Sequence, residues 1–238
     1  WELLLVDDKS PDANARKVME RAAAIDQRIR VAYRAENGGI VAASNDGLAM
    51  ATGEFVALLD NDDVLEPDAL AEVVAKFESD PLIDYVYTDE TLMTADGKII
   101  ERFFKPDWSP ERFRSQMYVC HLSVIRRSLM EEVGGFRKGY DGSQDYDLIL
   151  RVTEKARKVG HVRKLLYHWR MAASSVAKAP ALFPALSEND PRSAAPLSAQ
   201  GPAVGILFLW RVHPRPAPEH PIGQYSAARP HWTGLSQN

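Results

Sequence analysis

The first part of the chain alternates between short apolar runs and longer segments in which apolar residues recur at helical spacing. Runs of this length, rich in Leu, Val, Ile and Phe, are typical of strands buried in a sheet. Alternation of strands and helices predicts a mostly parallel, Rossmann-like α/β sheet with helices on both faces. The expected strands are 1–6, 30–33, 55–59 and 84–88, and the expected helices are 10–24, 38–51 and 67–79, the first with Ser10 as its N-cap.

The pattern becomes less regular after residue 90. Asp96-Gly97 predicts the turn of a hairpin within 91–103. A short helix is expected from Ser109-Pro110, and an amphipathic helix from Gln144 to about Lys158. Two further strands are expected at 122–126 and 162–167.

Residues 179–238 differ in composition from everything before them. They contain ten of the fifteen prolines and have no helical or strand periodicity. Because such a composition buries little apolar surface, we expect this segment to be a disordered tail or a non-native extension. Residues 1–178 are then the folded domain.

Polar clusters follow four successive strands of the predicted sheet. The carboxyl ends of parallel strands meet at one edge, where ligands of open α/β sheets bind. Four acidic or polar turns at one edge therefore predict a site for a polar, metal-bound ligand. The clusters are Asp7-Asp8, the group Arg34, Glu36 and Asn37, the run Asp60 to Asp63, and Asp89-Glu90.

The acidic run after strand 55–59 carries the sharpest signal. Asp60 and Asp62 alternate on extended backbone, so both carboxylates point the same way and could hold one divalent cation together with diphosphate oxygens. An acidic turn that caps the following helix is the alternative for such a short motif.

Bulk properties exclude several classes of protein. A net charge of −4 and a pI of about 5.9 argue against a general nucleic-acid binder. The single cysteine, Cys120, excludes a disulfide framework and favours a reducing compartment. No apolar run reaches transmembrane length, the longest being 204–210. The chain opens at Trp1 inside an apolar strand, as expected of a fragment without its beginning.

Several motifs taken together resemble one family. Residues 1–178 are similar to the nucleotide-diphospho-sugar transferase domain of family 2 glycosyltransferases, which has the GT-A fold. Each motif alone is weak, but their order and spacing are specific. The motifs are Val6-Asp7-Asp8-Lys9-Ser10, Asn37-Gly38-Gly39, Ala43-Ser44-Asn45, Leu59-Asp60-Asn61-Asp62-Asp63, Gly134-Gly135-Phe136, Gln144-Asp145-Tyr146-Asp147-Leu148, Tyr167-His168-Trp169-Arg170 and Ser174-Ser175-Val176-Ala177.

The resemblance implies a nucleotide and metal half at 1–90. It implies that Asp7 or, in preference, Asp8 contacts the nucleotide base, and that Asn37 fixes the loop around the nucleotide. It also implies that Asp60 contacts the donor and that Asp62 binds Mn²⁺ or Mg²⁺, while Asp63 is structural. Helix capping is the alternative for the first aspartates, and loop hydrogen bonding for Asn37.

The resemblance implies an acceptor and catalytic half at 91–178. Asp145 would take the proton of an acceptor hydroxyl in a single inverting displacement, and the dipole of its helix would keep it ionised. His168 could complete the metal shell and Arg170 could pair with the diphosphate through a bidentate fork. A purely structural His168 is an equal alternative, and Asp147 is expected to be structural. Cys120 and His121 are adjacent on extended backbone and are rejected as a nucleophilic dyad.

Two features depart from the family pattern. Family members usually begin with an extra strand and helix, so the sheet should lack its first strand and have a gap beside 1–6. Gln144 stands where many members have Glu, but Asp145 is retained.

The leading hypothesis is therefore a metal-dependent, inverting hexosyltransferase. It would use a nucleotide sugar, most often a UDP-sugar, and a glycan or lipid-linked acceptor of the cell surface. It would be cytoplasmic, with peripheral attachment to the inner face of the membrane. A nucleotidyltransferase and an inactive fragment or nucleotide-sugar-binding module are the alternatives.

Overall fold

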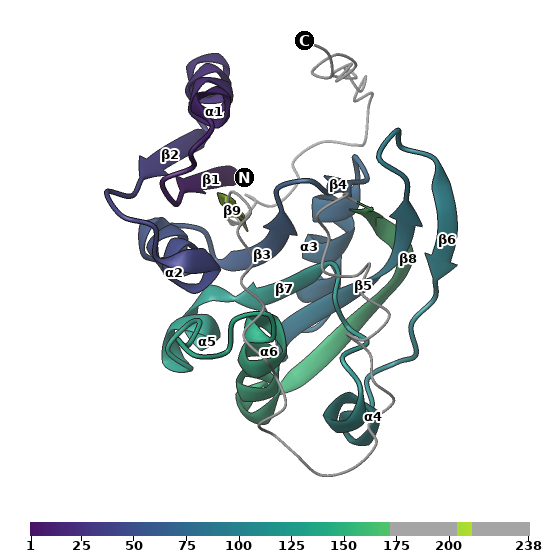
Figure 1. The fold of residues 1–238 in the computed structure, drawn as a ribbon. Helices are drawn as coiled ribbons and strands as arrows, with labels where there is room; N and C mark the ends of the chain where they lie inside the picture. The colour runs from purple at the N-terminus through teal and green to yellow at the C-terminus, as the bar shows by residue number, and fades with distance from the viewer. Residues whose placement is uncertain (172–203, 211–238) are drawn as a thin grey trace, which may run out of the picture.

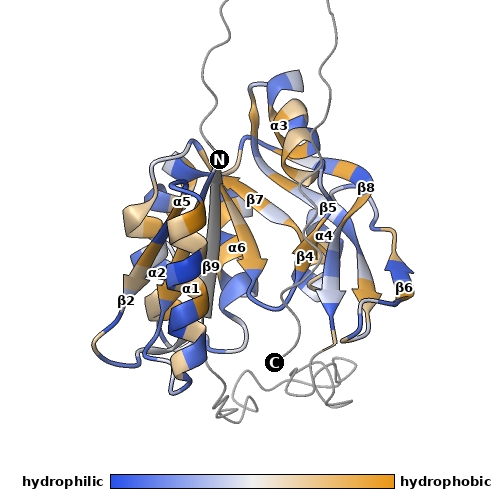
Figure 2. Cartoon of the chain, turned by 90° about the horizontal axis from the view of Figure 1, so that it is seen from above, coloured by the Kyte–Doolittle hydropathy of each residue, from blue (hydrophilic) through white to orange (hydrophobic). Residues whose placement is uncertain are grey.

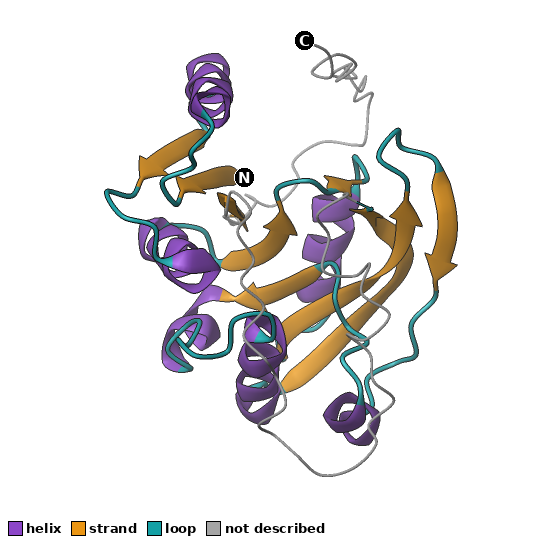
Figure 3. Ribbon diagram, viewed as in Figure 1, coloured by secondary structure: helices purple, strands orange, loops and turns teal. Residues whose placement is uncertain are grey.

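The computed structural model describes residues 1–171 and 204–210 (Figure 1). These residues form one curved nine-stranded sheet flanked by helices. The order of the strands is β2-β1-β9-β3-β7-β5-β8-β4, with β6 pairing with β5 at the edge of the molecule (Figure 3). The strands are β1 (Glu2–Asp7), β2 (Ile29–Tyr33), β3 (Phe55–Asp60), β4 (Val64–Leu65), β5 (Ile83–Met93), β6 (Ile99–Phe103), β7 (Ser123–Arg126), β8 (Lys158–Arg170) and β9 (Val204–Trp210).

The sheet is mixed, and its strands β1, β2, β3, β5 and β8 run in one direction, as the alternating pattern predicts. β1 pairs in parallel with β2, and β5 with β8. β7 lies antiparallel between β3 and β5, and β9 lies antiparallel between β1 and β3, so β1, β3 and β5 all run in the same direction. The carboxyl ends of these strands therefore share one edge of the sheet.

The helices begin close to the predicted positions, with one difference at the first. Asp12, not Ser10, caps α1: its carboxylate accepts a 2.8 Å hydrogen bond from the Asn14 amide. Ser109 caps α4 as expected. In the described part of the chain no helix is both long and apolar enough to cross a bilayer. The helices are α1 (Ala13–Ile25), α2 (Gly39–Met50), α3 (Ala69–Ser79), α4 (Pro110–Ser115), α5 (Arg127–Glu132) and α6 (Gln144–Lys155).

Side chains of β3 alternate between two apolar clusters. Val56 packs in a cluster that includes Leu148 of α6, whereas Phe55 stacks on Phe77 of α3 with ring centroids 4.0 Å apart. Figure 2 shows the apolar colouring concentrated on the central strands of the sheet. A strand with apolar residues on both faces is what the run 55–59 predicts.

β9 departs from the expectation for the C-terminal segment. β1 is an interior strand as predicted, but the position beside it is not a gap, because β9 occupies it along its whole length. Residues 204–210 therefore have regular structure, where the proline-rich composition predicted none. The remainder of 179–238 and the domain boundary at 178 lie outside the described residues.

β5 also departs from expectation, since it continues five residues beyond the predicted end at Thr88. Asp89 and Glu90 therefore lie within the strand and face opposite sides of the sheet. The Asp89 carboxylate contacts His161, while Glu90 contacts Lys105. Of these two carboxylates, only Glu90 belongs to the site described below.

Candidate active site

In the turn after β3, the carboxylates of Asp60 and Asp62 are exposed to solvent, whereas that of Asp63 is bound within the protein. Asp60 ends the strand with half of its side chain exposed (53%), and Asp62 is exposed. Asp63 instead accepts hydrogen bonds from the Tyr167 hydroxyl and the Arg170 amide. Asp63 thus fastens the turn to β8, the structural role that was expected of it.

Burial raises the pKa of Asp63 to about 6, and the negative charge of Asp60 adds to this effect. The Tyr167 hydroxyl oxygen also accepts a 3.3 Å hydrogen bond from the Asp60 amide. One tyrosine therefore bridges the first and last members of the acidic turn. The contact with Asp60 holds its backbone at the end of β3.

Asp145 lies in the first turn of α6, at the same site. Its pKa is raised to about 6, first by burial and then by the negative charge of Asp60. The helix N-terminus was expected to keep this carboxylate fully ionised, but desolvation and the neighbouring aspartate outweigh the dipole. An aspartate with this pKa is largely ionised at neutral pH and is a better base than an exposed one.

The structure shows what Gln144 does at a position where many family members have Glu. Its amide nitrogen donates a 3.0 Å hydrogen bond to Asp145 Oδ2, while its carbonyl oxygen accepts from the Gly142 amide at 2.7 Å. A glutamate at this position would place a second negative charge against Asp145. Gln144 instead orients the carboxylate and stabilises its ionised form.

A second group of charges lies at the site, of which the sequence predicted Glu90 but not its contacts with Lys105 and His121. The Lys105 ammonium, only 5% exposed, donates to Glu90 at 3.2 Å and to the carbonyl oxygen of His121 at 2.6 Å. The Glu90 carboxylate also accepts from the His121 amide. No motif joins these residues, because they come from β5, an irregular loop and the segment before β7.

His121 connects this group to the acidic turn. Its Nε2 lies 3.6 Å from Asp60 Oδ2, and its ring stacks on Tyr167 with centroids 4.7 Å apart. Despite burial, contact with Glu90 and the charge of Asp60 raises the pKa of His121 to about 9. At neutral pH His121 is therefore a cation beside the carboxylates of Asp60 and Glu90.

Cys120 has no such activation. Burial raises the pKa of its thiol well above the usual range, and the negative charge of Asp145 raises it further. A thiol that stays protonated is a poor nucleophile, which agrees with the rejection of a Cys120–His121 dyad. Asp147 is structural as expected, since Arg137 and Arg151 bind its carboxylate.

His168 lies close to the acidic turn but both of its ring nitrogens are engaged. Nδ1 is 2.7 Å from the Thr91 hydroxyl and Nε2 is 2.9 Å from Glu66 Oε1. Metal binding by His168 would require one of these contacts to open. The alternative role, a structural link between β5, β8 and the start of α3, is already fulfilled by the same contacts.

Arg170 is held against the acidic turn by backbone groups. Nε donates to the Asp62 carbonyl at 2.8 Å and Nη1 donates to the Ala95 carbonyl at 2.7 Å. A bidentate contact with a diphosphate would need at least one of these two nitrogens. Nη1 and Nη2 retain further N–H groups, so Arg170 could contact a phosphate oxygen while keeping both carbonyls.

The aspartates after β1 have unequal roles in the fold. Asp8, whose side chain is fully buried, binds Arg34 at 2.6 Å and accepts from the amides of Gly38 and Gly39 at 2.9 and 2.7 Å. Asp7 accepts from the Ser10 amide at 2.9 Å. Asn37 donates to the Asp8 carbonyl at 2.9 Å. These contacts hold the start of α2 against the end of β1, and the predicted base contact of Asp8 would compete with three existing donors.

The acidic turn fits a metal that shares its shell with a ligand. Within the described ranges no three His, Cys, Asp or Glu side chains are close enough to enclose an ion by themselves. Mg²⁺ and related hard cations, however, commonly bind through one or two carboxylates together with substrate phosphates and water. Asp62 and Asp60, both accessible, match that requirement.

Comparison with known sequences identifies one family. The model of the family described as "Glycosyl transferase family 2" matches residues 1–134. The O-antigen biosynthesis protein RfbC of Myxococcus xanthus is 42% identical over 177 residues, 74% of this chain and 14% of that protein. A chondroitin synthase of Pasteurella multocida is 30% identical over 168 residues, 70% of this chain and 17% of that protein. The chain thus spans a fifth or less of the length of these relatives.

Comparison with solved structures finds the same fold. Residues 1–349 of TarS from S. aureus superpose with a TM-score of 0.57 at 19% identity, covering 71% of this chain and 51% of that one. The mannosyltransferase PcManGT from Pyrobaculum calidifontis, in complex with GDP-Man and Mn²⁺, gives a TM-score of 0.55 at 21% identity, covering 74% and 49%. At these identities the likeness establishes the fold alone.

Proposed function

The chain belongs to glycosyl transferase family 2 and is a sugar-transferring domain, and from this premise we propose an inverting, metal-assisted transfer centred on Asp145 and the acidic turn. The observation that carries the proposal is the meeting of these two elements. The charge of Asp60 raises the pKa of Asp145, so the two carboxylates act on one another although 85 positions separate them in the sequence.

Asp145 acts as the general base in this proposal. The acceptor hydroxyl oxygen attacks the anomeric carbon of the donor, and its proton passes to Asp145. The bond between that carbon and the diphosphate oxygen breaks, so the diphosphate leaves with the electron pair. One displacement inverts the configuration at the anomeric carbon. General-base assistance of this kind contributes about 10²–10⁴-fold.

The acidic turn receives the donor in this proposal. Asp62, assisted by Asp60, holds Mn²⁺ or Mg²⁺, whose charge offsets the leaving diphosphate. His168 is proposed as a further ligand and Arg170 as a diphosphate contact. His168 must exchange a contact within the protein for one with the metal, whereas Arg170 has further N–H groups for the diphosphate. Asp7, Asp8 and Asn37 are proposed at the nucleotide end.

The ligands of relatives support this assignment at a coarser level. A structural neighbour was solved with GDP-Man and Mn²⁺, and curated relatives are named for O-antigen and chondroitin synthesis. We propose a nucleotide-sugar donor, with UDP-sugars as the first candidates, and a glycan or lipid-linked acceptor. We further propose a cytoplasmic protein that acts at the inner face of the membrane.

Hydrolysis of nucleotide sugars by the purified chain tests the proposal. We expect release of nucleoside diphosphate from a UDP- or GDP-sugar in Mn²⁺, and loss of that release in excess EDTA. Release of pyrophosphate from a nucleoside triphosphate and sugar phosphate would instead indicate a nucleotidyltransferase. Binding of a nucleotide sugar without any turnover would indicate a non-catalytic binding module.

A further inference from the structure

Lys105 is held at both ends by consecutive residues of β5. Its backbone amide donates a 2.9 Å hydrogen bond to Asp89 Oδ1, and its ammonium donates to Glu90 Oε2 at 3.2 Å. The ammonium also donates to the carbonyl oxygens of Val119 at 3.3 Å and of His121 at 2.6 Å. An ammonium has three N–H donors, and these three acceptors satisfy all of them. Lys105 therefore fixes the segment before β7 and does not offer its charge to a ligand.

The segment that Lys105 fixes lies at the reaction centre. The two carbonyl oxygens bound by the ammonium belong to the residues on either side of Cys120. The second of these residues, His121, places its Nε2 3.6 Å from Asp60 Oδ2. A displacement of Lys105 would therefore disturb the border of the acidic turn.

His161 fixes the carboxylate that binds the Lys105 amide. Its Nε2 lies 2.9 Å from Asp89 Oδ1, and the two side chains are only 4% and 3% exposed. The imidazole stacks on Tyr87, its partner on β5, with ring centroids 4.5 Å apart and planes 10° apart. A buried carboxylate that has a fixed donor has little freedom to turn away from its other partner, the Lys105 amide.

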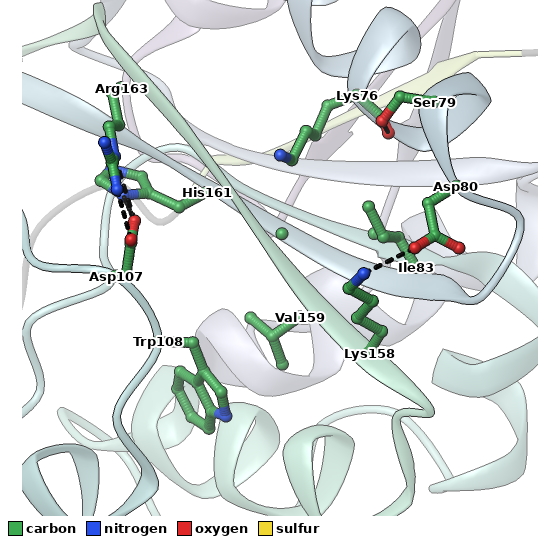
Figure 4. Close-up of a pocket in the computed structure, with 11 residues that line it drawn as sticks. Lys76, Ser79, Asp80, Ile83, Asp107, Trp108, Lys158, Val159, His161 and Arg163 are labelled. Carbon is green, nitrogen blue, oxygen red and sulfur yellow. Dashed lines mark hydrogen bonds and ion pairs between the residues drawn. The ribbon is translucent and has the colours of Figure 1, made fainter.

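Asp107 and Pro106 attach the loop after Lys105 to β5 and β8. The Asp107 carboxylate is bound by Arg163 and, at 3.2 Å, by His161 Nδ1; Figure 4 draws these three side chains at the wall of a cavity of about 660 Å³. The Pro106 carbonyl accepts a 2.6 Å hydrogen bond from the hydroxyl of the tyrosine that stacks on the imidazole. Three consecutive loop residues are thus bound to the sheet around one histidine.

We propose that Asp89 and His161 form a positioning pair for the reaction centre. The pair holds the Lys105 amide, and the Lys105 ammonium in turn keeps residues 119–121 beside the acidic turn. His161 acts only through these neighbours, since its ring is bound by carboxylates at a position seven residues before His168 on β8. The kinetic part of this inference rests on the proposed sugar transfer, whereas its structural part does not.

Alkylation of Cys120 by iodoacetamide measures the position of residues 119–121 without any turnover. Cys120 is the only cysteine of the chain, and burial raises the pKa of its thiol well above the usual range, so the wild type should react slowly. His161→Leu keeps an apolar side chain and removes both ring nitrogens. We expect alkylation to become about tenfold faster or more, because a thiol released to water loses at least one unit of its raised pKa.

Release of nucleoside diphosphate from a nucleotide sugar gives the second readout. His161→Leu should lower kcat about 10–100-fold, the scale of a small misplacement at a reaction centre, while UDP affinity in Mn²⁺ stays within about threefold. His161→Gln keeps an N–H donor near the position of Nε2. It should therefore restore both kcat and the alkylation rate to within about threefold of the wild type.

Asp84→Asn is the matched control, because it removes a buried charge of β5 that does not contact Lys105. It should leave alkylation within about twofold of the wild type at a temperature where all variants are folded. Equal alkylation of His161→Leu and the wild type, or equal acceleration in Asp84→Asn, would overturn the proposal.

Asp107→Ala provides a second variant should His161→Leu fail to fold, since its side chain is 62% exposed. Loss of this outer partner of the imidazole should accelerate alkylation about threefold, and an unchanged rate would contradict the proposal. Absence of turnover in every variant would refute the proposed sugar transfer, while the alkylation rates would still decide whether the pair positions residues 119–121.

Discussion

The basicity of Asp145 depends on the residues around it. Burial and the charge of Asp60 raise its pKa to about 6, so proton acceptance requires a pH above this value. We expect transfer to rise with pH through about 6 and then level off. Asp145→Asn should keep donor affinity within about threefold while transfer falls about 10²–10⁴-fold.

The measurements are donor titration and initial rates between pH 5 and 8. Glu154→Gln removes a carboxylate from the exposed face of the same helix and serves as the control. A parallel loss of donor affinity and rate in Asp145→Asn would assign the residue to donor binding or to the fold instead.

Asp62 is the exposed carboxylate that we propose as the principal metal ligand. Asp62→Ala should lose most of the Mn²⁺-dependent part of UDP or GDP binding and about 10²-fold or more in transfer. Titration of the nucleotide in Mn²⁺ and in EDTA measures this difference. Asp68→Ala is a matched change, since Asp68 makes no side-chain capping bond to α3. Unchanged nucleotide affinity in Asp62→Ala would refute the assignment.

At the scale of elements, ion pairs of the buried Asp84 carboxylate fasten strands together. Asp84, at the start of β5, accepts from the Arg157 amide at 3.0 Å, from its guanidinium at 2.6 and 2.9 Å, and from Arg126 at 3.1 Å. Hydrogen bonding to Arg157 holds the pKa of Asp84 below its usual value although burial opposes it. One carboxylate thus connects β5 to β7 and to the turn that precedes β8.

Asp84→Asn should therefore cost about 2 kcal/mol of unfolding free energy at pH 7. The ionised form is stabilised in the folded state, so this contribution is present above about pH 4, the pKa of an unfolded Asp, and is lost as pH falls through the lowered pKa. Denaturant unfolding at pH 7 and at pH 3 measures the difference. Glu132→Gln, in the exposed pair with Lys155, should change stability by less than about 1 kcal/mol. A penalty for Asp84→Asn that is equal at both pH values would contradict the electrostatic account.

The spacing of apolar residues predicted most of the helices and strands. Motifs and capping residues predicted fewer of the contacts between side chains. The strand 55–59 and the helix after Asn37 are close to the observed β3 and α2, because burial on both faces and a glycine start leave clear patterns. The α1 cap was misplaced by two residues, since Ser10 and Asp12 are both good caps. The pairing of Glu90 with Lys105 is a tertiary contact, for which no local pattern exists.

β9 was missed although its signal is present. Residues 204–210 form the longest apolar run of the chain, which is typical of a buried strand. The surrounding prolines outweighed this run in the interpretation of the C-terminal segment. The position of β9 between β1 and β3 could not be predicted, because pairing partners far apart in sequence leave no periodic trace.

At the scale of the whole molecule, β9 joins β1 and β2 to the rest of the sheet. Its residues pair with β1 on one side and with β3 on the other. Ile206→Pro removes a backbone N–H from the middle of this strand, and proline is disfavoured in interior strands. We expect a loss of about 2–3 kcal/mol, or about 4–10 °C in Tm.

Thermal unfolding and limited proteolysis measure this effect. Ile206→Val keeps the amide and should leave the Tm within about 2 °C. In the wild type, a protease-resistant product should retain residues 204–210 with the domain. Equal Tm for the two variants, with loss of 204–210 from the resistant product, would show that β9 contributes nothing to stability.

The position of β9 also affects how the chain can fold during translation. Glu2 pairs opposite Leu209, so the central ladder joins one segment to another that is translated much later. At about 5–20 residues per second, roughly 7–30 s separate the completion of β3 from the arrival of β9 at the ribosome exit. During that interval the facing edges of β1 and β3 are unpaired in the nascent chain and open to other strands. Slower translation would lengthen this exposure and favour aggregation of the emerging chain.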